Sequence, residues 1–259
     1  MIIPIWKKIG ESSHLLAQKV GILVFQKTKN EIDLKSTHTG TLDPMAQGIV
    51  VVLTGDDRFK KTSFSSWKKK YEFEVLFGIN TDSHDLLGIT NDIKIPDIQI
   101  INSKLEKIIS KFIGPQKQTQ PKFSSQRIDG KSGFDLAKNN INFEQKINEI
   151  KIFSLLLKKI ELLPIKKVEE IINKNVSKIE GDFRQKEIIE NWKNIFIELK
   201  KLGIKKLPIA RLEAVVSKRT YIRSLTNDIS KELNIPATTF SITRTENGNF
   251  QKKDCLNFL

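Results

Sequence analysis

The amino-acid sequence predicts an α+β protein, because it combines strand-like segments of two kinds with amphipathic helices. Residues 49–53 are all β-branched or leucine, which is typical of a buried strand. Residues 71–79 alternate apolar and polar side chains, as a strand with one face toward a core does. Residues 102–112 repeat apolar side chains at helical spacing. The 259 residues, 39% of them hydrophobic, suffice for one large domain with a substantial core.

Composition and charge limit the possible partners and the cellular location. Lys and Arg number 44 against 30 Asp and Glu, a net charge of +14 that suits a polyanionic partner. A lysine-rich proteome encoded by an AT-rich genome would give the same excess. The single cysteine, Cys255, excludes an internal disulfide and a cysteine-based zinc cluster, and indicates the reducing cytoplasm. No apolar run has membrane-spanning length, and residues 1–6 are too short for a signal peptide, so we expect a soluble protein without membrane contact.

The first segments of the chain lead to an unusual carboxylate. Residues 2–13 predict a short strand, a glycine turn and a helix capped near its Ser-Ser pair, Ser12 and Ser13. Farther on, glycines bracket the loop that carries Asp43, Pro44 fixes its backbone, and the buried strand that follows holds it rigid. A rigid loop can present a carboxylate for chemistry. The same residues also fit a simpler role, in which Asp43 caps a short helical turn that begins at Pro44.

The middle of the chain adds a basic helix and a polar turn. Residues 58–70 predict an amphipathic basic helix that faces solvent or a polyanion. After the strand at 71–79 come three potential metal ligands, Asp82, His84 and Asp85. No further ligands stand at a fixed spacing from them, so we expect turn chemistry and not a metal.

The next helix, at residues 102–112, is expected to be capped by Asn102 or Ser103 and stopped by the Gly-Pro pair at 114–115. A polar loop with glycine and proline follows at residues 116–138 and ends in a helix. Such a segment suits an arm that lies along RNA, and a plain surface connection has the same composition.

Residues 166–205 predict a helical hairpin between two strands. Gly181 separates its two helices, and Asp182 is expected to cap the second. One apolar face consists of Val168, Ile172, Val176 and Ile179, and the other of Ile188, Ile189, Trp192, Ile195, Phe196, Leu199 and Leu202. The hairpin either packs on the main domain or makes an independent contact with RNA or a partner.

Four blocks of sequence resemble one family. The segment H-T-G-T-L-D-P-M-A-Q-G at residues 38–48 is similar to the pattern G-H-x-G-x-L-D-P-x-A-x-G of the TruB family of tRNA pseudouridine-55 synthases. Further blocks around Tyr71, Phe123 and the string T-Y-I-R that ends at Arg223 follow in the family's order. The family's usual D-K-P-x-G-x-T-S at the N-terminus is matched weakly, by Lys8, Gly10 and Ser13.

The resemblance implies a pseudouridine synthase fold, with a central mixed, mostly antiparallel sheet flanked by helices and an RNA-binding cleft. Residues 1–259 then form a single catalytic domain with a helical insertion at about 166–205. The hairpin stands where compact bacterial members have a short turn. We expect no C-terminal PUA-type RNA-binding domain.

The resemblance also implies the site. Asp43 corresponds to the catalytic nucleophile, and Arg223 to the arginine that pairs with it. His38 corresponds to the histidine that helps displace the target uridine. The remaining substrate contacts expected are Tyr71 against the base, Tyr221, and Ile242 as an apolar wall, and the expected RNA contacts are Lys8, Lys70, Arg127, Lys218 and Arg244. A lysine beside a turn, a strand tyrosine or an arginine at a helix start also occurs for structural reasons alone.

One substitution within these blocks bears on the backbone. Arg219 stands where the family pattern has glycine. If that position needs a positive φ, the arginine implies either a locally different backbone or some strain.

The implied activity is isomerisation of uridine 55 in the T loop of tRNA, without cofactor or metal, by a monomer that binds the T arm. An RNA-binding or tRNA-folding protein without essential catalysis is the main alternative. A glycoside hydrolase would pair Asp43 with a second carboxylate such as Asp56, Asp57 or Asp85, and no paired signature supports it. A metal hydrolase would need a set of metal ligands that the sequence does not provide.

Overall fold

The protein is built on a nine-stranded sheet with the strand order β1-β3-β12-β4-β11-β10-β7, and the computed structural model describes residues 1–256. β2 and β13 pair with β3 and β12 outside this path. The pair formed by β3 and β12 is parallel and the other neighbours are antiparallel, which confirms the α+β class with a mixed, mostly antiparallel sheet. The strands are β1 (Ile2–Lys7), β2 (Ser36–His38), β3 (Ala46–Thr54), β4 (Lys69–Phe77), β7 (Gly114–Thr119), β10 (Ile147–Pro164), β11 (Lys206–Val216), β12 (Ala237–Asn247) and β13 (Phe250–Gln251).

Helices and two small hairpins complete the described chain. The hairpins pair β5 (Ile79–Thr81) with β6 (Thr90–Ile93), and β8 (Arg127–Ile128) with β9 (Lys131–Ser132). The helices are α1 (Ser13–Thr28), α2 (Lys61–Ser65), α3 (Ile98–Ser110), α4 (Gly133–Lys138), α5 (Ile165–Val176), α6 (Gln185–Lys201) and α7 (Ile222–Leu233), with 3-10 turns η1 (Glu31–Leu34), η2 (Gly55–Lys60) and η3 (Lys252–Asp254). None of these helices combines the length and apolar character that crossing a membrane requires.

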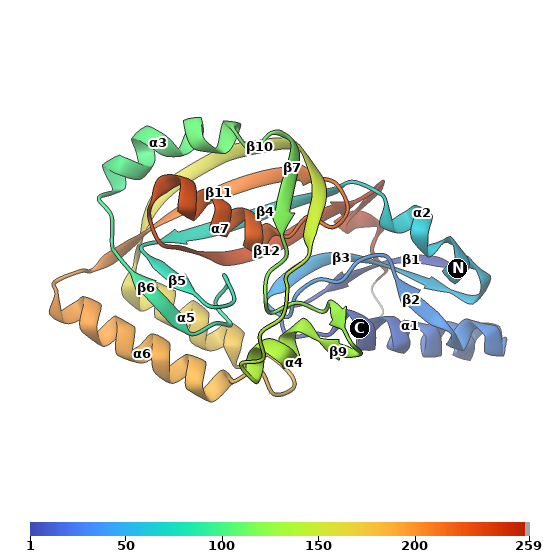
Figure 1. Ribbon diagram of the computed structural model, residues 1–259. Coiled ribbons are helices and arrows are strands. Elements are labelled where there is room, and N and C mark those ends of the chain that lie inside the picture. The colour runs from blue at the N-terminus through green and yellow to red at the C-terminus, as the bar shows by residue number, and fades with distance from the viewer. Residues whose placement is uncertain (257–259) are drawn as a thin grey trace.

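The two faces of the sheet are covered by different helices (Figure 1). On β4, Val75 and Phe77 point into the core that contains α3 and α7, as the alternation of the sequence predicts. Leu76 points the other way and packs with residues of α5 and α6. β3 is buried on both faces, since Val50 and Val52 belong to the first core while Ile49, Val51 and Leu53 form a separate cluster. Burial on both faces explains its uninterrupted apolar sequence.

The residues predicted to form a helical hairpin do so, as α5 and α6. Apart from Leu202, which is exposed, their apolar faces pack with Leu76, Leu86 and Met45, so the hairpin lies beside the loop that carries Asp43. Trp192 of α6 is fully buried, and its indole N–H donates to the carbonyl of Leu86 at 3.2 Å.

Three predicted helix boundaries were wrong. α3 begins at Ile98, because the carboxylate of Asp97 accepts from the backbone N–H of Gln99, so Asn102 and Ser103 lie inside the helix. The basic stretch at 58–70 holds only the short α2 beyond the turn η2, because β4 already begins at Lys69. Asp182 does not cap α6; the N-cap is Arg184 in the left-handed region, with φ 63°.

Replacement of Trp192 by alanine is expected to lower the free energy of unfolding by about 3–5 kcal/mol, because it leaves a cavity and removes a buried hydrogen bond. Urea denaturation measures this change. Leu202, which is 75% exposed, is the matched control on the same helical hairpin, and its replacement by alanine should cost less than about 0.5 kcal/mol. Equal effects of the two substitutions would contradict the packing described.

Candidate active site

The loop that carries Asp43 is held from below by β1 and the start of α1. The backbone N–H of Gly10 donates to the carbonyl of Pro44 at 3.0 Å, and the hydroxyl of Ser13 bonds both backbone groups of Leu42, at 3.0 and 3.2 Å. Lys7 is fully buried, and its ammonium donates to the carbonyls of Asp43 and Ala46 at 3.1 and 2.7 Å. These contacts come from the backbone, from a short side chain and from a fully buried lysine, so a rigid frame sets the position of the Asp43 loop.

Asp43 forms a two-pronged ion pair with Arg223, the arginine that the sequence resemblance singles out. The Nε of Arg223 lies 2.8 Å from Oδ2 of Asp43, and its Nη2 lies 2.9 Å from Oδ1. The Arg223 side chain is 3% exposed, whereas that of Asp43 is 26% exposed. The carboxylate is therefore oriented from behind by a buried cation and open to solvent in front. It does not cap a helical turn.

Arg223 is itself seated by the turn that follows β5. Its Nη1 donates to the carbonyl of Ser83 at 3.1 Å, and the carboxylate of Asp85 lies 3.6 Å from its Nε. Burial lowers the pKa of Arg223, but Asp43 and Asp85 raise it, and the net pKa lies above the ordinary value. Burial raises the pKa of Asp85 although Arg223 opposes that shift. The guanidinium thus stays charged beside Asp43.

The side chains of Asp82, His84 and Asp85 have separate partners. Asp82 pairs with Arg184 at 3.0 Å, and the ring of His84 lies 3.4 Å from the amide oxygen of Asn80. Asp85 accepts from the Ser83 hydroxyl at 2.7 Å. Within residues 1–256 no three acidic, histidine or cysteine side chains are grouped so as to hold a metal ion.

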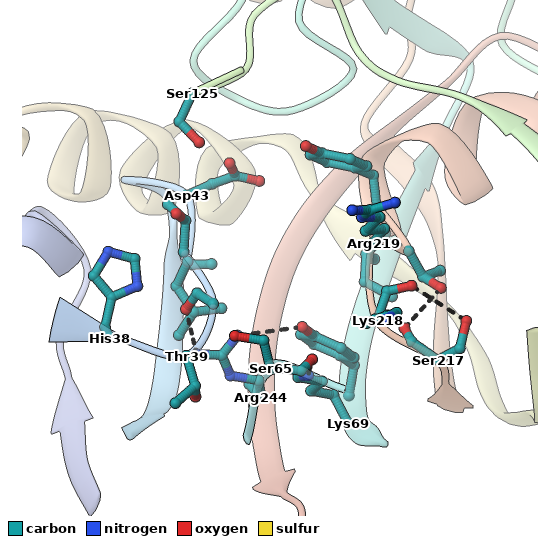
Figure 2. A pocket seen from close by; sticks show the side chains of 18 of the residues that line it. His38, Thr39, Asp43, Ser65, Lys69, Ser125, Ser217, Lys218, Arg219 and Arg244 are labelled. Carbon is teal, nitrogen blue, oxygen red and sulfur yellow. Dashed lines mark hydrogen bonds between the residues drawn. The ribbon is translucent and has the colours of Figure 1, made fainter. Parts of the chain in front are cut away.

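A cavity of about 450 Å³ opens in front of Asp43. Four of the predicted substrate contacts line it, namely His38, Tyr71, Tyr221 and Ile242. Figure 2 shows His38 and Asp43 on one side and Lys218 and Arg219 on the other. The cavity therefore combines an ion-paired carboxylate, aromatic and aliphatic walls, and a basic rim. A second cavity, of about 880 Å³, lies on the other side of the Asp43 loop and shares several of its residues.

Arg244 is a structural part of the cavity wall. It is 1% exposed, and its Nε donates to the carbonyl of Ile49 at 2.6 Å. Its Nη2 donates to the carbonyl of Gly40 at 3.1 Å, and its Nη1 lies 3.5 Å from the hydroxyl of Tyr71. The guanidinium thus ties β12 to the start of the Asp43 loop and fixes the tyrosine ring, a role that the sequence did not predict.

His38 faces the cavity as a neutral ring. Its pKa is lowered to about 4, chiefly by burial and further by the charges of Lys61 and Arg244. At neutral pH the imidazole therefore carries no charge. It offers a flat, uncharged surface to the cavity.

The predicted RNA contacts are scattered. Lys218 lines the first cavity and Arg127 the second. Lys70 instead pairs with Glu213 and Glu246 at 3.4 and 3.9 Å, and lines neither cavity. Lys8 is exposed and lies outside both.

Two lysines that the sequence reasoning missed belong to the site. Lys7 supports the Asp43 loop, and burial lowers its pKa to about 8 although Asp43 opposes the shift. Lys69 lines the first cavity, and its pKa is also lowered to about 8 by burial. The N-terminal pattern D-K-P-x-G, aligned on Gly10, does place its lysine at Lys7 and not at Lys8.

Acidification is expected to destabilise the protein through His38 and His84, whose pKa values burial lowers from 6.5 to about 4. Between these values the unfolded chain binds more protons, so the free energy of unfolding falls as the pH drops from 6.5 toward 4. We expect a loss on the order of 2 kcal/mol per histidine, measured by urea denaturation across this range. His84 has φ 60°, which asparagine tolerates, so His84→Asn should flatten the dependence. An unchanged pH dependence in His84→Asn would contradict this expectation.

Comparison with known proteins identifies the family of the chain. Residues 26–178 match the family described as TruB family pseudouridylate synthase (N terminal domain). A tRNA pseudouridine synthase B of Oceanobacillus iheyensis is 30% identical over 257 residues, which are 99% of this chain and 68% of that protein. One of Mycoplasma mobile is 32% identical over 226 residues, 87% of this chain and 62% of that protein.

Solved structures agree on the fold. A Cbf5-Nop10-Gar1 complex contains a chain that matches with a TM-score of 0.54 at 17% identity, over 97% of this chain and 50% of that chain. An H/ACA RNP bound to a substrate RNA containing 2'-deoxyuridine contains one with a TM-score of 0.52 at 17% identity, over 97% and 48%. This chain thus spans about two thirds of the length of the Oceanobacillus iheyensis protein and about half of the length of the two solved chains. By sequence match and fold, the chain belongs to the TruB family of pseudouridylate synthases.

Proposed function

We propose that this protein isomerises uridine 55 in the T loop of tRNA to pseudouridine, with Asp43 as the nucleophile. One observation carries the role of Asp43: its carboxylate opens into a cavity of about 450 Å³ while a buried arginine binds both of its oxygens. The names of the relatives support the reaction and the class of substrate. We also propose that the protein acts as a monomer in the cytoplasm and binds the T arm.

The reaction needs no redox partner and no cofactor. The N1–C1′ bond of the uridine breaks, the uracil turns, and a C5–C1′ bond forms. The proton on C5 is lost to solvent and N1 gains one, so atoms and electrons balance. Asp43 attacks either C1′ of the sugar or C6 of the base, and in both cases it must be ionised and held in place. The two-pronged pairing with Arg223 holds the carboxylate in place and puts a positive charge beside it.

The cavity suits a uridine that has left the stack of an RNA loop. Extrusion costs a few kcal/mol, which contacts in the pocket must offset. The ring of Tyr71 and the side chain of Ile242 provide apolar surface for a flat base. Neutral His38 lines both cavities, and its ring can occupy space that the uridine vacates. Basic groups at the rim, such as Lys61 and Lys218, attract the phosphates.

The test is incubation of the purified protein with an unmodified tRNA transcript that carries uridine tritiated at C5. Release of tritium that maps to uridine 55 is expected, because the reaction exchanges the C5 proton. Asp43→Asn serves as the control for a contaminating enzyme. A folded, tRNA-binding protein that releases no tritium would overturn the proposal and leave the tRNA-folding function.

A further inference from the structure

The helical insertion, which is the hairpin of α5 and α6, reaches the second cavity beside Asp43. This cavity is called the groove below. The connection between its two helices, residues 179–184, lines the second cavity through Glu180, Gly181, Asp182 and Phe183. That cavity, about 880 Å³ in volume, also contains Asp43, His38 and Arg223. The insertion is therefore part of the wall of the groove, although its helices pack behind the sheet.

Within the wall of the groove, the connection between α5 and α6 packs against the segment 122–138, which contains α4. Figure 1 shows α4 beside the connection between α5 and α6. The ring of Phe183 lies 4.5 Å from that of Phe134, which lies 5.8 Å from that of Phe123. Lys138 of α4 forms an ion pair with Asp182. A row of rings and one ion pair thus join the insertion to a wall segment that is polar and rich in serine.

Arg184 stands at the centre of these contacts. Its guanidinium lies 4.6 Å from the ring centre of Phe123, and its Nη2 lies 3.0 Å from a carboxylate oxygen of Asp82. The side chain is only 16% exposed. Its backbone has φ 63°, a left-handed conformation that arginine rarely adopts. Such a conformation persists where surrounding contacts impose it, so the side chain is held in this place.

The partner of Arg184 belongs to the turn that seats the catalytic pair. Asp82 accepts from the backbone N–H of Ile89 at 2.9 Å, which closes this turn. The next residue, Ser83, offers its carbonyl to Arg223 at 3.1 Å. Arg184 therefore touches both the turn behind Asp43 and the wall in front of it.

The insertion also meets the N-terminal support of the Asp43 loop. Gly10 donates to Pro44, and a Cβ on Gly10 would lie 2.3 Å from the carbonyl oxygen of Lys178, at the end of the insertion's first helix. Glycine is required there because the backbone of the insertion passes so close. The insertion thus contacts three segments around the Asp43 loop: the wall segment, the turn at 82–89 and the support at Gly10.

We propose that residues 179–184 position the wall segment 122–138 against the groove for substrate RNA, with Arg184 as the central positioning residue. The proposal rests on the proposed function, because it assigns the segment a place in tRNA binding. The wall lies beside the RNA before and during reaction, so its loss should weaken ground-state and transition-state binding alike. The chemistry at Asp43 should be changed less.

Arg184→Ala is the decisive variant. We expect it to raise KM for tRNA about tenfold and to leave kcat within about threefold, because uniform binding is lost. Hydrogen exchange should rise at the amides of 122–138 and stay unchanged within α5 and α6. Arg184→Lys keeps an ion pair with Asp82 but loses the flat cation over Phe123, so its KM should lie between those of the wild type and the alanine variant.

Lys200→Ala is the matched control. Lys200 pairs with Glu169 at 3.0 Å and links the same two helices on their exposed side, away from the groove. This variant should behave as the wild type in KM, kcat and exchange. A KM for Arg184→Ala equal to that of Lys200→Ala, or unchanged exchange at 122–138, would overturn the proposal. A wild type that releases no tritium would instead overturn the proposed function, so the two failures are distinguishable.

Discussion

Asp43→Asn is expected to lower the rate of pseudouridine formation by about 10⁴-fold or more while tRNA still binds. The amide has almost the shape of the carboxylate, but it is a poor nucleophile and carries no charge. The cavity walls do not depend on it, because Lys7, Ser13 and Gly10 hold the loop through other groups. Single-turnover tritium release measures the rate, and fluorescence anisotropy with labelled tRNA measures binding.

The asparagine variant must be shown to fold. It leaves Arg223 buried with one good partner fewer, although Ser83 and Asp85 remain beside the guanidinium. Some loss of stability is therefore expected, and circular dichroism with a thermal scan controls for it. A dissociation constant for tRNA within about threefold of that of the wild type, together with absent turnover, supports Asp43 as the nucleophile. Turnover close to that of the wild type would remove Asp43 from the mechanism.

Much of the fold was predictable, because its cause lies in local patterns. The alternation of β4, the apolar run of β3 and the hairpin of α5 and α6 all follow from which faces are buried. The pairing of Asp43 with Arg223 was accessible only through resemblance, since 180 residues separate the two. No periodicity in the sequence predicts a contact between side chains so far apart in the chain.

Other parts of the site depend on tertiary contacts that no pattern carries. Arg244 reads as a basic residue at the end of a strand, yet it is buried because carbonyls of β3 and of the Asp43 loop accept its N–H groups. The burial of Lys7 likewise depends on carbonyls of Lys8, Asp43 and Ala46, which accept from its ammonium. Arg219 has φ 64°, so the arginine adopts the left-handed backbone that favours glycine, and the backbone does not avoid this region.

Arg223→Lys is expected to lower kcat by about 10²-fold or more with little change in the dissociation constant for tRNA. A lysine keeps the positive charge, but its single ammonium cannot hold both oxygens of Asp43 and the carbonyl of Ser83 at once. The carboxylate is then free to rotate, and a small misplacement at the reacting atom is costly. Single-turnover kinetics at saturating enzyme measures the chemical step.

Arg211→Lys gives the matched comparison. Arg211 also pairs with a carboxylate, Glu74, at 2.8 Å, but on an exposed strand surface outside both cavities. The same chemical change there should leave kcat within about twofold, since exposed ion pairs contribute little. If Arg223→Lys also kept kcat near that of the wild type, the charge alone would suffice to activate Asp43. Orientation of the carboxylate by the two-pronged contact would then have no part in catalysis.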